Sequence, residues 1–272
     1  MSASGLPLIL EPDQLRERLG APELLVVDLC RPEVYAAVHV PGAVHLDYGA
    51  IVASRPPVGG LLPDAEVLAR ALSALGLAPE HHVVAYDDEG GGKAARLLWT
   101  LDVLGHVEHS LLNGGLHAWA NEGHPVSNEP VVAEASDYVA SIGREHQADK
   151  DYILARLEDP DMVLVDTRTP EEYRGERVLA RHGGHIPGAV NMDWMQAMDQ
   201  SRNLRLKPDA ELRSLLDQRG VTPDKEIVTY CQTHHRSAHT YVVLKALGFP
   251  RLRGYPGAWS EWGNLPDTPL EV

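Results

Sequence analysis

The hexapeptide HVPGAV at residues 39–44 recurs almost unchanged as HIPGAV at residues 185–190, and this repetition decides how the chain is organised. Three further pairs keep the same order around it: VVD at 26–28 with LVD at 164–166, VVAY at 83–86 with IVTY at 227–230, and GGLHAW at 114–119 with GYPGAW at 254–259. The period is too long for a solenoid, whose repeats span about 20–50 residues. The sequence therefore predicts two tandem copies of one domain.

The 272 residues divide into two units of ordinary domain size. We expect a first domain over residues 1–127 and a second over residues 150–272. Between them, residues 128–149 contain Pro130, Gly143 and scattered charges that interrupt the hydrophobic periodicity. Such a composition is typical of a linker that runs over the surface.

Within each half, short apolar runs alternate with segments of helical periodicity. Strands are predicted over residues 24–27, 83–86, 162–165 and 227–230, and helices over residues 65–75, 94–104, 210–218 and 237–247. A glycine follows each helix, where a residue in the left-handed conformation commonly ends one: Gly76, Gly105, Gly220 and Gly248. The alternation implies parallel strands joined by helical crossovers, hence an α/β fold in which each domain has a mostly parallel sheet flanked by helices.

The charge balance narrows the choice of partners. The chain has 24 basic and 39 acidic residues, a formal net charge of −15, so a nucleic-acid partner is not expected. No apolar run approaches the roughly 18 residues of a membrane span, and the segment LPLIL at residues 6–10 lacks the flanks of a signal peptide. We expect a monomeric, cytoplasmic protein that binds no membrane.

Two cysteines, Cys30 and Cys231, are too few for a disulfide framework, and neither lies in a CxxC pattern. The glycines of GGGK at residues 90–93 lack the spacing of a phosphate-binding loop. We therefore expect no metal and no organic cofactor. Cys30 follows a hydrophobic strand without a comparable loop, which favours a structural role.

Cys231 begins the segment CQTHHR at residues 231–236, between a strand that ends near Tyr230 and a helix that begins near Arg236. The first N–H groups of a helix have no partners within it, and together with the helix dipole they stabilise an anion. A cysteine there can have its pKa lowered from about 8.5 to roughly 3.5–7.5. In the first half Asp87 occupies the cysteine position, so that half is predicted to be non-catalytic.

In order, VDTR, GHIPGAVN, the strand–cysteine–loop–helix segment and GYPGAW resemble the rhodanese family of sulfurtransferases, in the tandem form whose second domain alone keeps the cysteine. The resemblance covers about residues 26–269. It implies that the Cys231 thiolate takes sulfur from thiosulfate or a similar anion and passes it from a persulfide to cyanide, glutathione or a thioredoxin-like thiol. It also implies that the persulfide is held by backbone N–H groups of the loop: Gln232, Thr233, His234, His235 and Arg236.

This loop departs from the family patterns and leaves alternatives open. Well-known thiosulfate enzymes have basic residues directly after the cysteine, whereas mercaptopyruvate enzymes have glycine and serine there. A 3-mercaptopyruvate sulfurtransferase and a persulfide carrier that serves a protein partner therefore stay as alternatives. His234 and His235 either shape the loop or help to select the substrate. A cysteine-dependent phosphatase or arsenate reductase is a remote alternative, because such loops have five residues between Cys and Arg and this one has four.

Supporting residues are expected around the VDTR element. Asp166 and Arg168 are predicted to form a structural ion pair or a loop brace, since an ionised thiol needs no proton abstraction. The tandem family often has an arginine shortly after this element to hold the anionic group of the donor. The aligned residue here is Glu172, and we expect Arg174 or Arg177 to reach the same space.

Overall fold

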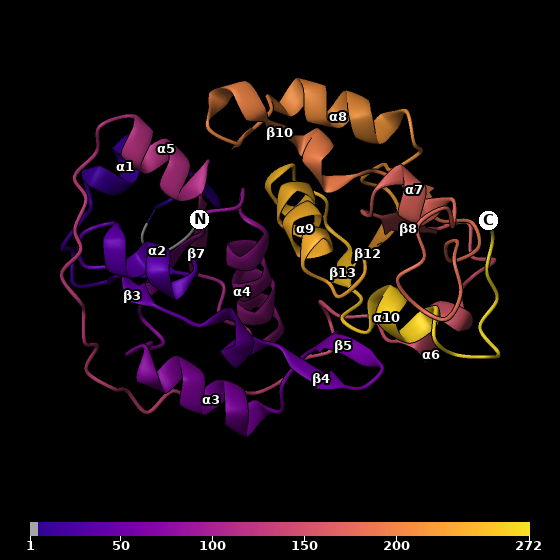
Figure 1. Ribbon diagram of the computed structural model, residues 1–272, viewed down its shortest axis with the longest axis horizontal. Helices are drawn as coiled ribbons and strands as arrows, with labels where there is room; N and C mark the ends of the chain where they lie inside the picture. The colour runs from indigo at the N-terminus through magenta and orange to yellow at the C-terminus, as the bar shows by residue number, and fades with distance from the viewer. Residues whose placement is uncertain (1–4) are drawn as a thin grey trace. The chain divides into compact units, whose positions relative to one another are not determined.

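The computed structural model describes residues 5–272, which form two compact units (Figure 1). The first unit comprises the chain up to Ile51 together with residues 63–143 and 198–206. The second comprises residues 52–62, 144–197 and 207–272. No helix in the described part of the chain has the length and apolar character needed to cross a membrane.

The first unit is built on a five-stranded sheet in the order β1-β7-β6-β2-β3, in which every pairing is parallel. Its strands are β1 (Ile9–Leu10), β2 (Leu24–Asp28), β3 (Val44–His45), β6 (His82–Tyr86) and β7 (His109–Leu112). Its helices are α1 (Pro12–Arg16), α2 (Pro32–Ala37), the 3-10 turn η1 (Tyr48–Ile51), α3 (Ala65–Ala74), α4 (Gly92–Val103) and α5 (Gly115–Asn121). Helix α4 packs on β6 and β7.

The second unit repeats this plan with a parallel sheet in the order β13-β12-β8-β9. Its strands are β8 (Met162–Asp166), β9 (Val190–Asn191), β12 (Glu226–Tyr230) and β13 (Leu252–Gly254). Its helices are α6 (Lys150–Leu154), α7 (Pro170–Tyr173), η2 (Trp194–Ala197), α8 (Asp209–Asp217), α9 (Arg236–Ala246) and α10 (Ala258–Trp262). Helix α9 packs on β12 and β13, as α4 does on its own sheet.

The predicted α/β fold class is confirmed, as are the four strands and four helices expected from the apolar pattern. Each boundary lies within two residues of its predicted position. The four glycines that follow the helices have φ between +69° and +82°, the left-handed region that a side chain disfavours.

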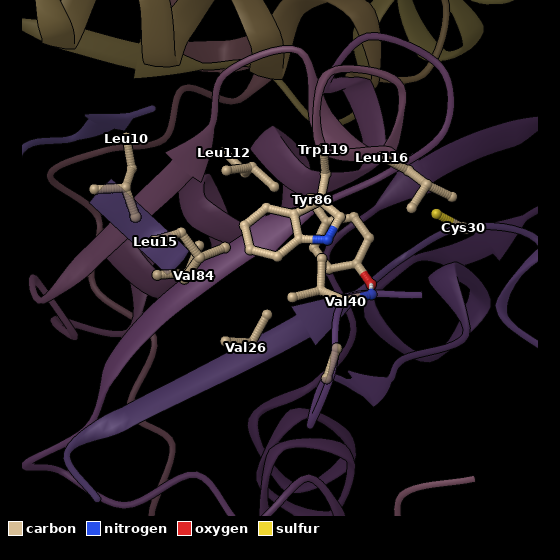
Figure 2. Close-up of a cluster of buried hydrophobic side chains, with 11 residues drawn as sticks. Leu10, Leu15, Val26, Cys30, Val40, Val84, Tyr86, Leu112, Leu116 and Trp119 are labelled. Atoms are coloured by element: carbon tan, nitrogen blue, oxygen red, sulfur yellow. Dashed lines mark hydrogen bonds between the residues drawn. The ribbon is translucent and has the colours of Figure 1, made fainter. Parts of the chain in front are cut away.

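Repeated residues also build the two cores. In the first unit, Val26, Val84, Tyr86 and Trp119 lie in one buried cluster, and Figure 2 shows the two aromatic rings among the aliphatic side chains. The corresponding residues of the second unit are also clustered: Leu164, Val228, Tyr230 and Trp259. Apolar residues at matching positions therefore bury the same face of each sheet.

Two short hairpins each belong to the unit that is built mainly from the other half of the sequence. The hairpin of β4 (Ala53–Arg55) and β5 (Val58–Leu61) belongs to the second unit. The hairpin of β10 (Met198–Asp199) and β11 (Arg205–Leu206), joined by η3 (Gln200–Arg202), belongs to the first. The units therefore differ from the predicted domains 1–127 and 150–272 at these segments. An isolated two-stranded hairpin is marginal in water, so its place is decided by the surface on which it packs.

Hydrogen bonds tie the β10–β11 hairpin to the first unit. The guanidinium of Arg205 donates to Glu11 over 3.0 Å and pairs with Glu122, and the backbone N–H of Leu206 donates to the Asn113 side chain over 2.8 Å. In the predicted linker, the backbone N–H of Ser136 donates to the carbonyl of Ser73 over 2.9 Å. The linker therefore follows the first unit as far as Gly143.

Candidate active site

Cys231 lies at the junction of β12 and α9 and is 1% exposed. Helix α10 holds the start of the loop from one side, because its backbone N–H groups donate to two loop carbonyls. Trp259 donates to Cys231 over 2.9 Å and Ser260 donates to Gln232 over 3.0 Å. The backbone N–H groups of Thr233 and Ser237 donate to the Cys231 sulfur.

The surroundings of the sulfur favour its ionised form. Burial alone raises the pKa of Cys231, but the charge of Arg236, the hydroxyl and amide of Ser237 and the amide of Thr233 outweigh burial and lower the pKa to about 7. At pH 7 about half of the thiol is therefore ionised, against about 3% for an ordinary cysteine with a pKa near 8.5. The loop is built to hold a thiolate.

A pH titration of the thiolate tests this description. The ultraviolet absorbance of the thiolate, taken as the difference between the protein and its Cys231→Ser variant, will rise with a midpoint near pH 7. Ordinary thiols titrate about 1.5 pH units higher. A midpoint at or above that of a model thiol would show that burial outweighs the cationic and N–H donors.

Cys30 has the opposite environment. It is 3% exposed, and its backbone N–H donates to the carboxylate of Asp28 over 2.7 Å. Burial raises the pKa of the Cys30 thiol, and the charges of Asp28, Asp87 and Asp88 raise it further. Cys30 is therefore a buried neutral thiol, as its place after a hydrophobic strand indicates.

The two histidines of the loop differ in their contacts. His234 is buried in the left-handed region, at φ 53°, and its Nδ1 lies 2.7 Å from the Ser237 hydroxyl. That contact shapes the loop, because Ser237 is also a donor to the Cys231 sulfur. His235 is half-buried, with its ring centroid 5.7 Å from that of Trp194.

Arg236, which closes the loop, forms a salt bridge with Glu172. Its two terminal nitrogens donate to the two carboxylate oxygens over 2.7 and 2.9 Å, a bidentate geometry that orients both side chains. Glu172 is 2% exposed and also caps α7, where it exchanges hydrogen bonds with Thr169. Burial alone raises the pKa of Glu172, but its bonds to Arg236 outweigh burial and lower the pKa.

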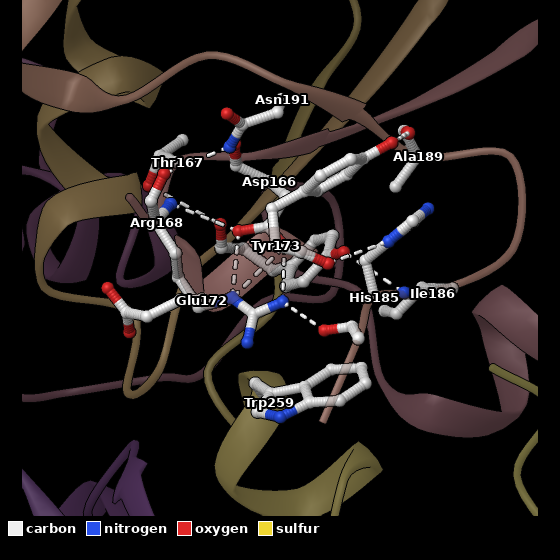
Figure 3. Close-up of polar contacts among 12 residues, drawn as sticks. Asp166, Thr167, Arg168, Glu172, Tyr173, His185, Ile186, Ala189, Asn191 and Trp259 are labelled. Carbon is white, nitrogen blue, oxygen red and sulfur yellow. Dashed lines mark hydrogen bonds and ion pairs between the residues drawn. The ribbon is translucent and has the colours of Figure 1, made fainter. Parts of the chain in front are cut away.

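Asp166 and Arg168 form the expected ion pair, and both are buried (Figure 3). Arg168 donates to the carboxylate of Asp166 over 3.0 Å through Nε and to the carbonyl of Gly184 over 2.7 Å through a terminal nitrogen. Its guanidinium carbon lies 4.4 Å from the centroid of the Trp259 ring. The pair thus braces the end of β8 against α10.

Arg174 and Arg177 are not brought to the loop by any contact in the described structure. Arg174 is half-exposed and pairs with Glu176 over 2.7 Å, and Arg177 is exposed. The guanidinium that lies beside Glu172 is that of Arg236.

The HIPGAV turn supports the strand that leads to Cys231. The Tyr230 hydroxyl accepts from the N–H of Ile186 over 3.1 Å. The Tyr173 hydroxyl donates to the carbonyl of Ala189 over 2.7 Å (Figure 3). The first unit has the same bond from the N–H of Val40 to Tyr86, over 3.0 Å. The repeated motif is therefore turn architecture in both units.

Asp87 stands at the cysteine position of the first unit, and its side chain is hydrogen-bonded to the backbone of the loop that follows it. One carboxylate oxygen accepts from the N–H groups of Glu89 and Gly91 over 3.0 and 2.8 Å, and the other accepts from that of Ala94 over 3.0 Å. Asp87 is fully buried. This loop therefore directs three N–H donors at its own carboxyl group, where the second unit has a cysteine.

Removal of the Asp87 carboxyl group has a predictable cost in stability. Asp87→Ala leaves three loop N–H groups without their acceptor, and we expect the free energy of unfolding to fall by about 2–3 kcal/mol. Denaturant unfolding measures the change, with Asp267→Ala at an exposed position as the control. An unchanged stability would mean that these bonds contribute nothing net.

Two features of the site have only weak signals in the sequence. The spacing of Thr169 and Glu172 matches a capping box and predicts the start of a helix, but not that the same carboxylate faces Arg236. Ser237 follows the loop arginine directly, yet a serine at a helix start is equally typical of an ordinary cap.

In residues 5–272 no group of three or more His, Cys, Asp or Glu side chains is arranged to hold a metal ion.

Comparisons with known proteins agree with the duplicated fold. The rhodanese-like domain model matches residues 11–122 and again residues 149–265. The chain is 51% identical to a thiosulfate sulfurtransferase of Azotobacter vinelandii and 47% identical to one of Pseudomonas aeruginosa, in each case over 99% of this chain and 98% of the relative. The structure of a 3-mercaptopyruvate sulfotransferase from Escherichia coli, 27% identical, superposes with a TM-score of 0.83 over 93% of this chain and 99% of that one. The chain therefore belongs to the rhodanese family of sulfurtransferases.

Proposed function

We propose that the protein moves sulfane sulfur from thiosulfate to cyanide or a thiol through a persulfide on Cys231. The observation that carries this proposal is a thiol with a pKa of about 7 in a loop closed by Arg236, at the strand–helix junction. The names of the relatives with 51% and 47% identity support thiosulfate as the donor.

In the first half-reaction, the Cys231 thiolate attacks the outer sulfur of thiosulfate. A new S–S bond forms, the S–S bond of thiosulfate breaks, and sulfite leaves with the bonding electron pair. The resulting persulfide carries a negative charge, which the loop N–H groups of residues 232–236 would hold without reorganising, as an oxyanion hole does. In the second, cyanide or a thiolate attacks the terminal sulfur and Cys231 leaves as a thiolate.

The acceptor in the cell is expected to be a thiol, such as glutathione or a thioredoxin-like protein, with the protein acting in the cytoplasm. A thiol acceptor receives the sulfur as its own persulfide, so no redox cofactor is needed for the transfer itself. The two cysteines are too few for a disulfide framework, which supports this location.

3-Mercaptopyruvate is the alternative donor, favoured by the structural likeness to the Escherichia coli enzyme. Arg174, the arginine expected to bind a donor carboxylate, pairs with Glu176 instead, and the Arg236 guanidinium is bound to Glu172. We therefore expect thiosulfate to load Cys231 more efficiently, and parallel kcat/KM measurements with the two donors decide between them.

The direct test is the mass of the loaded protein. After incubation of reduced protein with excess thiosulfate and removal of the donor, the peptide that contains Cys231 will gain one sulfur, about 32 mass units, and cyanide will reverse the gain. A gain from mercaptopyruvate alone would change the donor. Stoichiometric loading with no turnover on small acceptors would indicate a sulfur carrier instead.

A further inference from the structure

The unit that carries Cys231 contains a segment from the first half of the sequence. Residues 52–62 belong to this unit, and their hairpin places β5 beside α10 (Figure 1). Helix α10 is the element whose backbone N–H groups hold the start of the Cys231 loop. The hairpin is thus packed against the support of the candidate active site.

The serine of α10 connects the hairpin to the loop. The hydroxyl of Ser260 accepts from the N–H of Gly59 over 3.1 Å and lies 2.9 Å from the Gly59 carbonyl oxygen. The backbone N–H of the same serine donates to the carbonyl of Gln232 over 3.0 Å. Ser260 is 4% exposed, so these bonds are protected from water.

A second contact is direct and involves backbone on both sides. Gly60 is buried at φ +76°, and a Cβ on it would lie 2.1 Å from the carbonyl oxygen of Thr233 and 2.6 Å from its carbonyl carbon. No side chain fits there, because the obstacle is backbone and not the end of a flexible side chain. Gly60 therefore lies in contact with the peptide that follows Thr233.

Contacts on both sides of Thr233 restrict how far the loop can move away from Gly60. On one side the carbonyl of Gln232 is bonded to α10. On the other, His234 is buried and its Nδ1 lies 2.7 Å from the Ser237 hydroxyl. Thr233 lies between these fixed residues, and its N–H is one of the donors that face the Cys231 sulfur.

We propose that the β4–β5 hairpin is a positioning element of the Cys231 site and that Gly60 is its positioning residue. By contact with Thr233, the hairpin fixes the loop in the conformation that directs N–H donors at the thiolate and, if the proposed function holds, at the persulfide. A segment from the half of the sequence that lacks the cysteine thereby positions the Cys231 loop of the other half.

The test compares Gly60→Ala with a matched control. Gly42 has almost the same φ, +78°, but a Cβ there meets nothing within 4 Å, so Gly42→Ala introduces the same backbone strain without a clash. We expect Gly60→Ala to raise the midpoint of the Cys231 thiolate titration by about 0.5–1 pH unit and to slow persulfide loading about tenfold, because misplaced donors stabilise the anion less. Gly42→Ala will leave both unchanged.

The titration separates this inference from the proposed function, since it requires no sulfur donor. Arg236, whose charge lowers the pKa of Cys231, and its partner Glu172 are present in both variants. If wild-type protein fails to load sulfur, the proposed reaction fails while the titration still tests the hairpin. A folded Gly60→Ala variant with the wild-type midpoint and loading rate would overturn the inference.

A milder variant covers the case in which Gly60→Ala does not fold. Ser260→Ala keeps the backbone bond to Gln232 and removes the hydroxyl, which binds Gly59 and also contacts the carbonyl of Gly257. We expect a smaller shift of the titration midpoint in the same direction, with a loading rate reduced about two- to threefold. A variant that titrates and loads as the wild type does would show that the hairpin does not position the loop.

Discussion

Replacement of Cys231 by serine will abolish persulfide formation and lower kcat by at least about four orders of magnitude, as removal of a covalent nucleophile does in other enzymes. Serine keeps nearly the same volume, so the loop and its bonds to α10 are expected to stay in place. It cannot form an S–S bond with the outer sulfur of the donor. It is also neutral near pH 7, so the donors around it lose their anion.

The matched control is Cys30→Ser, because Cys30 is also buried but has a raised pKa. The control should load one sulfur per chain as the wild type does, with the mass gain on the peptide that contains Cys231. Sulfur retained in Cys231→Ser would move the reactive thiol to Cys30 and contradict the site. Loss of loading in both variants would point to misfolding, which circular dichroism detects.

Much of the fold follows from local sequence. The buried strands β6 and β12 are mostly apolar, with sequences HVVAY and EIVTY, and the helices after them are followed by glycines with positive φ. Their place is therefore decided by residues near in the chain. The hairpins are different. The segment RPPVGG at residues 55–60 shows a turn but not the surface on which it packs, which is α10 and the Cys231 loop.

In the candidate site, too, some features follow from local sequence and others only from the folded chain. Cys231 and the loop to Arg236 are recognisable because strand, loop and helix are contiguous in sequence. Glu172 is 64 residues from Arg236, and the sequence places an acidic side chain where the family often has an arginine. Only the folded chain shows that this carboxylate binds the loop arginine, a contact set by how α7 and α9 approach each other.

After Cys231, we expect substitutions in the pair of Glu172 and Arg236 to have the largest effects on the protein. Both side chains are mostly buried, at 2% and 18% exposure, so each neutral variant leaves the other charge with little compensation from water. We expect Arg236→Gln to lower the free energy of unfolding by about 3–5 kcal/mol, since breaking one partner of a buried pair costs this much. Glu172→Gln should cost somewhat less, because Arg236 is the more exposed partner.

The double variant Glu172→Gln/Arg236→Gln separates stability from catalysis. Two facing amides restore hydrogen bonds without a buried charge, so we expect it to be more stable than Arg236→Gln by about 1.5–3 kcal/mol. Sulfur loading should not recover with stability. Without the Arg236 charge, the pKa of Cys231 rises, and loading at pH 7 should stay about 10- to 100-fold below wild type in both variants.

The pH dependence of unfolding gives the pair a second, independent signature. The pKa of Glu172 is lowered in the folded protein, so its contribution to stability is present above the unfolded value of about 4.5 and is lost as the pH falls through the folded pKa. Denaturant midpoints measured between neutral and acidic pH should therefore fall less steeply in Glu172→Gln than in the wild type. Parallel curves would show that the carboxylate gains nothing from Arg236 in solution. In that case the bidentate contact would orient the guanidinium toward the thiolate without stabilising the fold.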